Sequence, residues 1–176
     1  LFRSHFLPYL DYDAFMTSSN SFKDDALRAI KKKPDVVISS LPYHQTEIVG
    51  LGCIDNGVRY CDLGGRVDVS ERINTEAVAK NSLVATDLGL APGWVNIMAE
   101  FACEELKGCS IKDVTMMVGG LPKNPELRNP FKYNVTWSVD GLINEYRDDC
   151  IILMDGRIKV VEGMEGLETV ETKIGP

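Results

Sequence analysis

The sequence has no apolar run that approaches the ~20 residues of a membrane-spanning helix, and it has no excess of basic charge. Its formal net charge is -7. A surface of this sign does not attract nucleic acid or an anionic membrane. We therefore expect neither nucleic acid nor a membrane among its partners. The 176 residues are enough for one full domain or two partial ones.

Cysteine and histidine are also arranged sparsely. The five cysteines form no CxxC pair, and the two histidines, His5 and His44, lie far apart in the sequence. A disulfide framework or a zinc site would need closer spacing than this. We therefore expect reduced thiols, no metal site and a cytoplasmic location.

The chain does not begin with methionine, and neither end carries an obvious starting or closing element. It opens on an irregular stretch, residues 1–12, and it ends on Gly175-Pro176. We expect both ends to be truncations.

The first part of the chain alternates helical and strand patterns with short connections. Such alternation predicts an α/β fold with right-handed crossovers and a parallel sheet. The run Val36-Val37-Ile38 predicts a buried strand, and Gly57 is a candidate for ending a helix. The expected helices cover residues 22–33, with Pro34 as the stop, 44–56 and 71–80, and the expected strands cover residues 35–38, 58–62 and 83–88.

Small or polar residues follow each of the three expected strands. They are Ser39-Ser40, then Asp62 with Gly64-Gly65, then Asp87 with Gly89. The carboxyl ends of parallel strands meet at one edge of a sheet, where ligands bind in open α/β folds. We therefore favour a ligand crevice over a purely structural edge.

The stretch around which the chain is organised runs from residue 86 to residue 96. The apolar strand Leu83-Val84-Ala85 enters it, two glycines and a proline allow a tight turn, and a helix begins near Trp94. An ordinary strand–turn–helix junction would show the same pattern. We expect this helix to reach about Leu106.

From about residue 108 the pattern changes to a second, mostly antiparallel α+β domain. Residues 113–118 and 133–139 alternate as strands do, residues 142–147 carry a helical pattern, and Asp155-Gly156 predicts a hairpin within residues 150–161. The predicted division is therefore residues 1–107 for a partial dinucleotide-binding domain and residues 108–176 for a second, partial domain. No GxGxxG motif is present, so the pyrophosphate-cradling half would lie upstream, and NAD is not distinguished from NADP.

Several motifs in one order resemble the saccharopine dehydrogenase-like oxidoreductases. The resemblance runs from about residue 20 to residue 171, and its Asp62-Leu63-Gly64-Gly65 run and the segment from Trp137 to Tyr146 are most similar to the lysine 6-dehydrogenase branch. The remaining motifs are Asp35-Val36-Val37-Ile38-Ser39-Ser40-Leu41-Pro42 with His44, Gly89-Leu90-Ala91-Pro92-Gly93, Gly119-Gly120-Leu121-Pro122, Asn129-Pro130-Phe131, Tyr133 and Trp137-Ser138.

The resemblance implies the C-terminal half of a Rossmann-type sheet, followed by a domain with substrate contacts and a dimer interface. It implies oxidation of a C–N bond of an amino acid or diamine, with NAD or NADP as cofactor and a homodimer as the assembly. By position, the residues along the cofactor would be Ser39, Ser40, Leu41, Pro42, Leu88, Gly89, Leu90 and Ala91. The residues at the substrate would be Gly93, Asn96, Tyr133, Trp137, Ser138 and Asp140.

One position departs from the saccharopine-forming members of the family. These carry an arginine two residues after the Trp-Ser pair, whereas this chain has Asp140 there. A carboxylate would repel the glutamate arm of saccharopine and attract an ammonium group. This favours lysine or another diamino substrate.

A proton acceptor would assist hydride transfer, because only a neutral amine gives up hydride. Asp62 and Asp87 both follow strands at the proposed crevice, so either could serve as the catalytic base. Each could instead cap a helix or close a turn. Three functions stay open: a lysine 6-dehydrogenase-like enzyme, a saccharopine or carboxyspermidine dehydrogenase-like enzyme, and a non-catalytic remnant or dimerisation module of the same fold.

Overall fold

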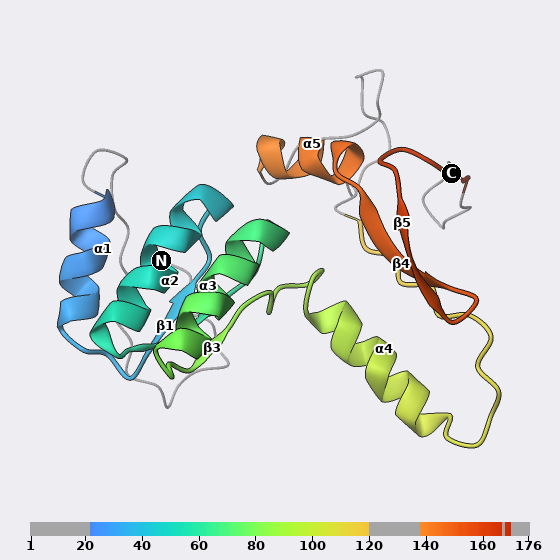
Figure 1. Cartoon of the computed structure of the whole chain (residues 1–176), viewed down its shortest axis with the longest axis horizontal. Coiled ribbons are helices and arrows are strands. Elements are labelled where there is room, and N and C mark those ends of the chain that lie inside the picture. The colour runs from blue at the N-terminus through green and yellow to red at the C-terminus, as the bar shows by residue number, and fades with distance from the viewer. Residues whose placement is uncertain (1–21, 120–137, 167, 170–176) are drawn as a thin grey trace, which may run out of the picture. The chain divides into compact units, whose positions relative to one another are not determined.

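The computed structural model of the chain describes residues 22–119, 138–166 and 168–169, and Figure 1 shows the course of these segments. The chain forms two compact units. The first comprises Leu1–Asp62 and Val69–Thr86, and the second comprises Leu63–Asp68 and Asp87–Pro176. The predicted domain boundary near residue 107 stays a prediction.

The first unit is a three-stranded parallel sheet with helices packed against it, which confirms the predicted α/β class. The strands lie in the order β1-β2-β3, and α2 lies between α1 and α3 (Figure 1). Each crossover from one strand to the next contains a helix, as parallel pairing requires. The elements are α1 (Phe22–Lys31), β1 (Val36–Ser39), α2 (Tyr43–Asn56), β2 (Arg59–Asp62), α3 (Val67–Ala79) and β3 (Val84–Ala85).

Glycine and proline set the helix ends in this unit. α1 ends three residues before Pro34, which cannot continue a helix. α2 ends at Gly57, whose φ of 66° is left-handed and whose N–H donates to the Cys53 and Ile54 carbonyls. The predicted helix end at Gly57 is confirmed. α3 begins at Val67, four residues earlier than expected.

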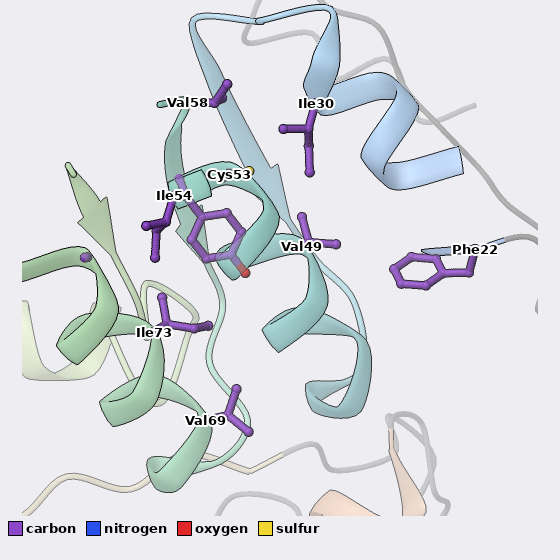
Figure 2. Close-up of a cluster of buried hydrophobic side chains, with 10 residues drawn as sticks. Phe22, Ile30, Val49, Cys53, Ile54, Val58, Val69 and Ile73 are labelled. Carbon is purple, nitrogen blue, oxygen red and sulfur yellow. The ribbon is translucent and has the colours of Figure 1, made fainter. Parts of the chain in front are cut away.

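The hydrophobic core of the described residues lies in the first unit, and Figure 2 shows most of its side chains between α1, α2 and α3. Its largest fully buried side chains are Ile30, Cys53 and Ile73. A Cβ at Gly50 of α2 would lie 2.8 Å from Cδ1 of Ile73 and 3.2 Å from Cε1 of Tyr60, so α2, α3 and β2 pack tightly there. The core comprises Phe22, Ile30, Val49, Cys53, Ile54, Val58, Tyr60, Val69, Ile73 and Ala77.

β1 is covered on one face only by the residues that the structure describes. Val36 is 47% exposed and Ile38 is 69% exposed, whereas Ser39 is buried and Val37 packs on the core. The prediction of a buried strand is therefore confirmed for the face toward the helices and not for the other face.

The described residues of the second unit form two helices and one antiparallel hairpin. They are α4 (Trp94–Glu105), α5 (Val139–Arg147), β4 (Cys150–Met154) and β5 (Arg157–Val161). The hairpin turns at Asp155 and Gly156, which have φ values of 52° and 70°, as a two-residue turn with matching twist requires. The predicted hairpin is confirmed, and α4 starts where it was expected.

Two strand predictions in the second unit differ from the structure. Residues 113–118 are described and carry no regular secondary structure, so the strand predicted there is wrong. Of the strand predicted for residues 133–139, only Ser138 and Val139 are described, and Val139 begins α5. No helix in the described ranges is both long and apolar enough to cross a membrane.

Candidate functional site

The carboxyl ends of β1 and β2 bring two predicted site residues together. Ser39 and Asp62 are opposite each other in the parallel register, and their exposed fractions are 3% and 2%. Tyr60 precedes Asp62 by two residues and therefore lies on the same face of β2, where it is 2% exposed. A hydroxyl, a phenol and a carboxylate thus share a buried position on the side of the sheet that the helices cover.

The Tyr60 phenol is the centre of this group. Its oxygen donates to the Thr46 carbonyl in the first turns of α2 at 3.4 Å. Burial is the main cause that raises the pKa of Tyr60. The nearby Ser39 hydroxyl lowers that pKa, and the neighbouring Asp62 carboxylate raises it. The phenol therefore stays protonated and available as a donor in this cluster.

The Asp62 carboxylate also acts on the next residue of its strand. The pKa of the Cys61 thiol is raised, first by burial and then by the negative charge of Asp62. Such a thiol stays neutral and is a poor nucleophile. The part of the chain that the structure describes contains no group of three or more His, Cys, Asp or Glu side chains that could hold a metal ion.

The cofactor segment predicted after β1 forms the entry to α2. Ser40 and Pro42 are exposed, and Leu41 packs partly on the core. The Thr46 hydroxyl donates to the Leu41 carbonyl at 3.3 Å and to the Pro42 carbonyl at 3.4 Å, which fixes the course of this segment. No side chain among the described residues caps the N-terminus of α2 at Pro42.

The second predicted cofactor segment lies in what we call the glycine turn, residues 87–93, which leads from β3 into α4. Leu88 and Leu90 are 49% and 64% exposed. The Trp94 N–H donates to the Gly89 carbonyl at 2.8 Å, and the Val95 N–H donates to the Leu90 carbonyl at 3.1 Å. These bonds close the turn on itself and leave the two leucine side chains on its surface.

Two of the predicted substrate residues serve as helix caps. The Asn96 side-chain oxygen accepts from the N–H of Gly93 at 3.0 Å, at the start of α4. The Ser138 hydroxyl accepts from the N–H of Gly141 at 3.1 Å, at the start of α5. Asp140 is exposed in the first turn of α5, where a carboxylate complements the helix dipole. Tyr133 and Trp137 lie outside the described residues.

The structure thus places Asp62 in the first unit with Ser39, and Asp87 in the second unit with Gly89 and Gly93. Whether either carboxylate accepts a proton from a substrate stays a prediction. Tyr60 and Thr46 were not among the predicted site residues. The period-two alternation of β2 could have indicated Tyr60, because it sets that side chain on the face of Asp62.

Comparison with known proteins gives one family match and several relatives. Residues 89–175 match the saccharopine dehydrogenase C-terminal domain. The mitochondrial alpha-aminoadipic semialdehyde synthase of Rattus norvegicus is 27% identical over 143 residues, which are 80% of this chain and 15% of the rat protein. The saccharopine dehydrogenase [NADP(+), L-glutamate-forming] of Schizosaccharomyces pombe is 25% identical over 148 residues, 83% of this chain and 33% of that protein.

A solved structure shows the same fold. Apo saccharopine dehydrogenase (L-Glu forming) from Saccharomyces cerevisiae superposes with a TM-score of 0.53 at 21% identity, covering 80% of this chain and 32% of that chain. The chain spans about a third or less of the length of these relatives. The matches agree with the resemblance read from the motifs, although none of them indicates the lysine 6-dehydrogenase branch. Residues 89–175 thus match the saccharopine dehydrogenase C-terminal domain, and the chain is similar to saccharopine dehydrogenases over about 80% of its length.

Proposed function

We propose that this chain forms part of a nicotinamide-dependent oxidoreductase that acts on the C–N bond of an amino acid or a diamine. The observation that carries the proposal is the share of this chain that the sequence matches cover. They extend over 80% or more of the chain in both the rat and the fission yeast relatives, so they include residues of both units. A relationship confined to the domain at residues 89–175 would support a dimerisation module equally well.

We propose NADP as the first cofactor to test, because the names of the yeast relatives specify NADP(+). Residues of each unit offer suitable surface. In the first unit, the segment from Ser39 to Pro42 leaves the N-terminus of α2 without a side-chain cap. In the second unit, the exposed apolar side chains of Leu88 and Leu90 suit a planar aromatic ring.

When bound, the nicotinamide supplies the hydride acceptor, so the protein's task is to hold its reactive carbon close to the substrate in a dry site. We propose that the close-packed glycine turn fixes Leu88 and Leu90 for that purpose. Asp62 is 2% exposed and its cluster includes the phenol of Tyr60. We propose that Asp62 orders the end of β2, where a fixed carboxylate can stabilise electrostatically the positive charge that develops on the substrate nitrogen as hydride leaves.

For the substrate we propose an amino acid with a second amine, as in a lysine 6-dehydrogenase. Asp140 supports a diamino substrate. Its exposed carboxylate lies at the position where the saccharopine-forming members of the family that this chain resembles carry an arginine. The second candidate is saccharopine or a carboxylated polyamine. Saccharopine is favoured by the three fungal relatives that are named as saccharopine dehydrogenases.

The test compares L-lysine and saccharopine as substrates of the full-length protein, each with NAD and with NADP, by following formation of the reduced coenzyme. We expect turnover of L-lysine and a preference for NADP over NAD. Turnover of saccharopine and not of lysine would reject the lysine proposal and keep the oxidoreductase. A folded protein that binds neither coenzyme would contradict the oxidoreductase and favour the non-catalytic module.

We also propose that the protein is a homodimer. One face of the hairpin carries Ile151, Leu153, Ile158 and Val160, which are between 66% and 77% exposed. Contiguous apolar surface of this kind supports an interface. Sedimentation equilibrium should give twice the chain mass, and a monomer at micromolar concentration would contradict the proposal.

We propose a reducing compartment such as the cytoplasm, supported by five cysteines without a CxxC pair.

A further inference from the structure

Asp87 lies against the backbone of Gly64, a residue of the loop that follows β2. A Cβ added to Gly64 would be 2.5 Å from Oδ1 of Asp87, 3.0 Å from Cγ of Pro92 and 3.2 Å from Cα of Asp87. Both residues belong to the second unit. The Asp87 carboxylate therefore occupies the space that any side chain at position 64 would need.

The two glycines of the glycine turn, Gly89 and Gly93, also have no space for a side chain. A Cβ at Gly89 would lie 2.5 Å from the Leu63 carbonyl oxygen. A Cβ at Gly93 would lie 2.5 Å from the Gly89 oxygen and 2.7 Å from the Asp87 oxygen. Since these neighbours are backbone atoms, they cannot rotate away as a flexible side chain can. Leu63 and Gly64, which follow β2, thus pack tightly against the glycine turn.

Within the glycine turn, Asp87 has an unusual backbone conformation. Its φ is 61°, in the left-handed region that non-glycine residues rarely adopt and that aspartate tolerates best together with asparagine. Such a conformation carries a cost, which persists only where the surrounding structure holds it. The contact of the Asp87 side chain with Gly64 supplies such a restraint.

We propose that Asp87 is a positioning residue, whose side chain rests on Gly64 and holds the glycine turn in the conformation that presents Leu88 and Leu90 to the nicotinamide coenzyme. This rests on the proposed function, and it assigns Asp87 a role other than that of the proton acceptor. The contact that Oδ1 makes beside Gly64 is required, and a negative charge is not. Asparagine, which keeps that oxygen and tolerates the same φ, should replace aspartate.

The first test measures the turn directly and needs no coenzyme. Amide hydrogen exchange at Trp94 and Val95 reports the bonds that close the turn onto Gly89 and Leu90. We expect exchange about tenfold faster in Asp87→Ala and in Gly64→Ala, and unchanged exchange in Asp87→Asn. The matched control is Gly108→Ala, because Gly108 has a φ of 95° and no atom within 4 Å of an added Cβ. Unchanged exchange in Asp87→Ala would overturn the proposal.

The second test uses steady-state kinetics of the full-length protein. A positioning role predicts that Asp87→Ala raises the KM for the coenzyme about tenfold or more, with a smaller change in kcat. Asp87→Asn should keep both parameters and the whole pH profile of kcat/KM. Loss of the acidic limb of that profile in Asp87→Asn, with normal amide protection, would identify Asp87 as the proton acceptor and overturn the proposal.

The two measurements also separate this inference from the proposed function. A wild-type protein without dehydrogenase activity would reject the proposed function, and with it the coenzyme that the turn is inferred to meet. The exchange rates of Asp87→Ala and Asp87→Asn would still decide whether the side chain holds the turn.

Discussion

The phenolic oxygen of Tyr60 donates to the carbonyl oxygen of Thr46 at 3.4 Å, and this bond joins β2 to the first turns of α2. Both residues are buried, with exposed fractions of 2% and 3%. The same phenol interacts with the side chains of Ser39 and Asp62. One hydroxyl group thus interacts both with α2 and with the carboxyl ends of β1 and β2.

Replacing Tyr60 with phenylalanine should lower the free energy of unfolding by about 1–3 kcal/mol. The change keeps the ring in the core and removes the donor, so buried oxygen atoms lose a hydrogen-bond partner. Urea denaturation followed by circular dichroism measures the effect. The control is Tyr146→Phe, because Tyr146 is 58% exposed and its substitution should change stability by less than about 0.5 kcal/mol. Equal stability of the two variants would show that the Tyr60 hydroxyl contributes nothing.

The sequence predicted those features of the fold that local chemistry decides. Gly57 and the pair Asp155-Gly156 adopt positive φ values, which is why they could be read as a helix end and a hairpin turn. The expected strand at residues 113–118 was wrong because alternation describes only one face of a strand. A strand also needs a neighbour for its backbone hydrogen bonds, and among the described residues no strand pairs there.

The candidate site was predictable in part for the same reason. Parallel strands end at one edge, so the sequence could place Ser39 and Asp62 together, and the register confirms it. It could not show that Asp62 would be buried, because burial depends on which face α2 and α3 cover. The strand expected up to Leu88 ends at Ala85, since the left-handed Asp87 already belongs to the turn.

Ile73 should be among the most sensitive positions of the first unit. Its side chain is fully buried between α3, α2 and Tyr60, so Ile73→Ala leaves a cavity and should cost about 2–5 kcal/mol of unfolding free energy. The matched control lies on the same helix. Val78 is 75% exposed, and Val78→Ala should change stability by less than about 0.5 kcal/mol. Thermal unfolding by circular dichroism compares the two, and a loss below about 1 kcal/mol for Ile73→Ala would contradict the described core.

The Cys53 thiol should make the fold sensitive to alkali. Burial raises its pKa from 9.0 to about 12, so above pH 9 the unfolded thiol ionises while the folded thiol stays protonated. The unfolded state then binds fewer protons, and stability should fall with rising pH by about 1.4 kcal/mol per pH unit. Below pH 9 this contribution is fully present, and it is lost progressively as the pH rises toward 12.

The pH test of Cys53 compares the wild type with Cys53→Ala between pH 8.5 and pH 9.5, below the ordinary tyrosine pKa of about 10. Urea midpoints should fall with pH in the wild type and stay nearly level in the variant, although the variant is less stable throughout because of its cavity. Parallel slopes would show that Cys53 ionises in the folded state as readily as in the unfolded state.

An aromatic disulfide reagent should label the exposed Cys109 and Cys150 quickly and Cys53 only on unfolding.

Asn96 allows the cap and the substrate contact to be separated. Its side-chain oxygen accepts from the Gly93 N–H, an otherwise unpaired donor at the start of α4, so Asn96→Ala should destabilise that helix by about 1 kcal/mol. Asn96→Asp keeps the acceptor and adds a negative charge at the positive end of the helix dipole, so it should preserve or raise the stability of α4. Hydrogen exchange of the α4 amides measures both variants. If Asn96 serves only as a cap, Asn96→Asp keeps the substrate KM of the wild type. A large rise in that KM with an intact helix would assign the Asn96 side chain to the substrate instead.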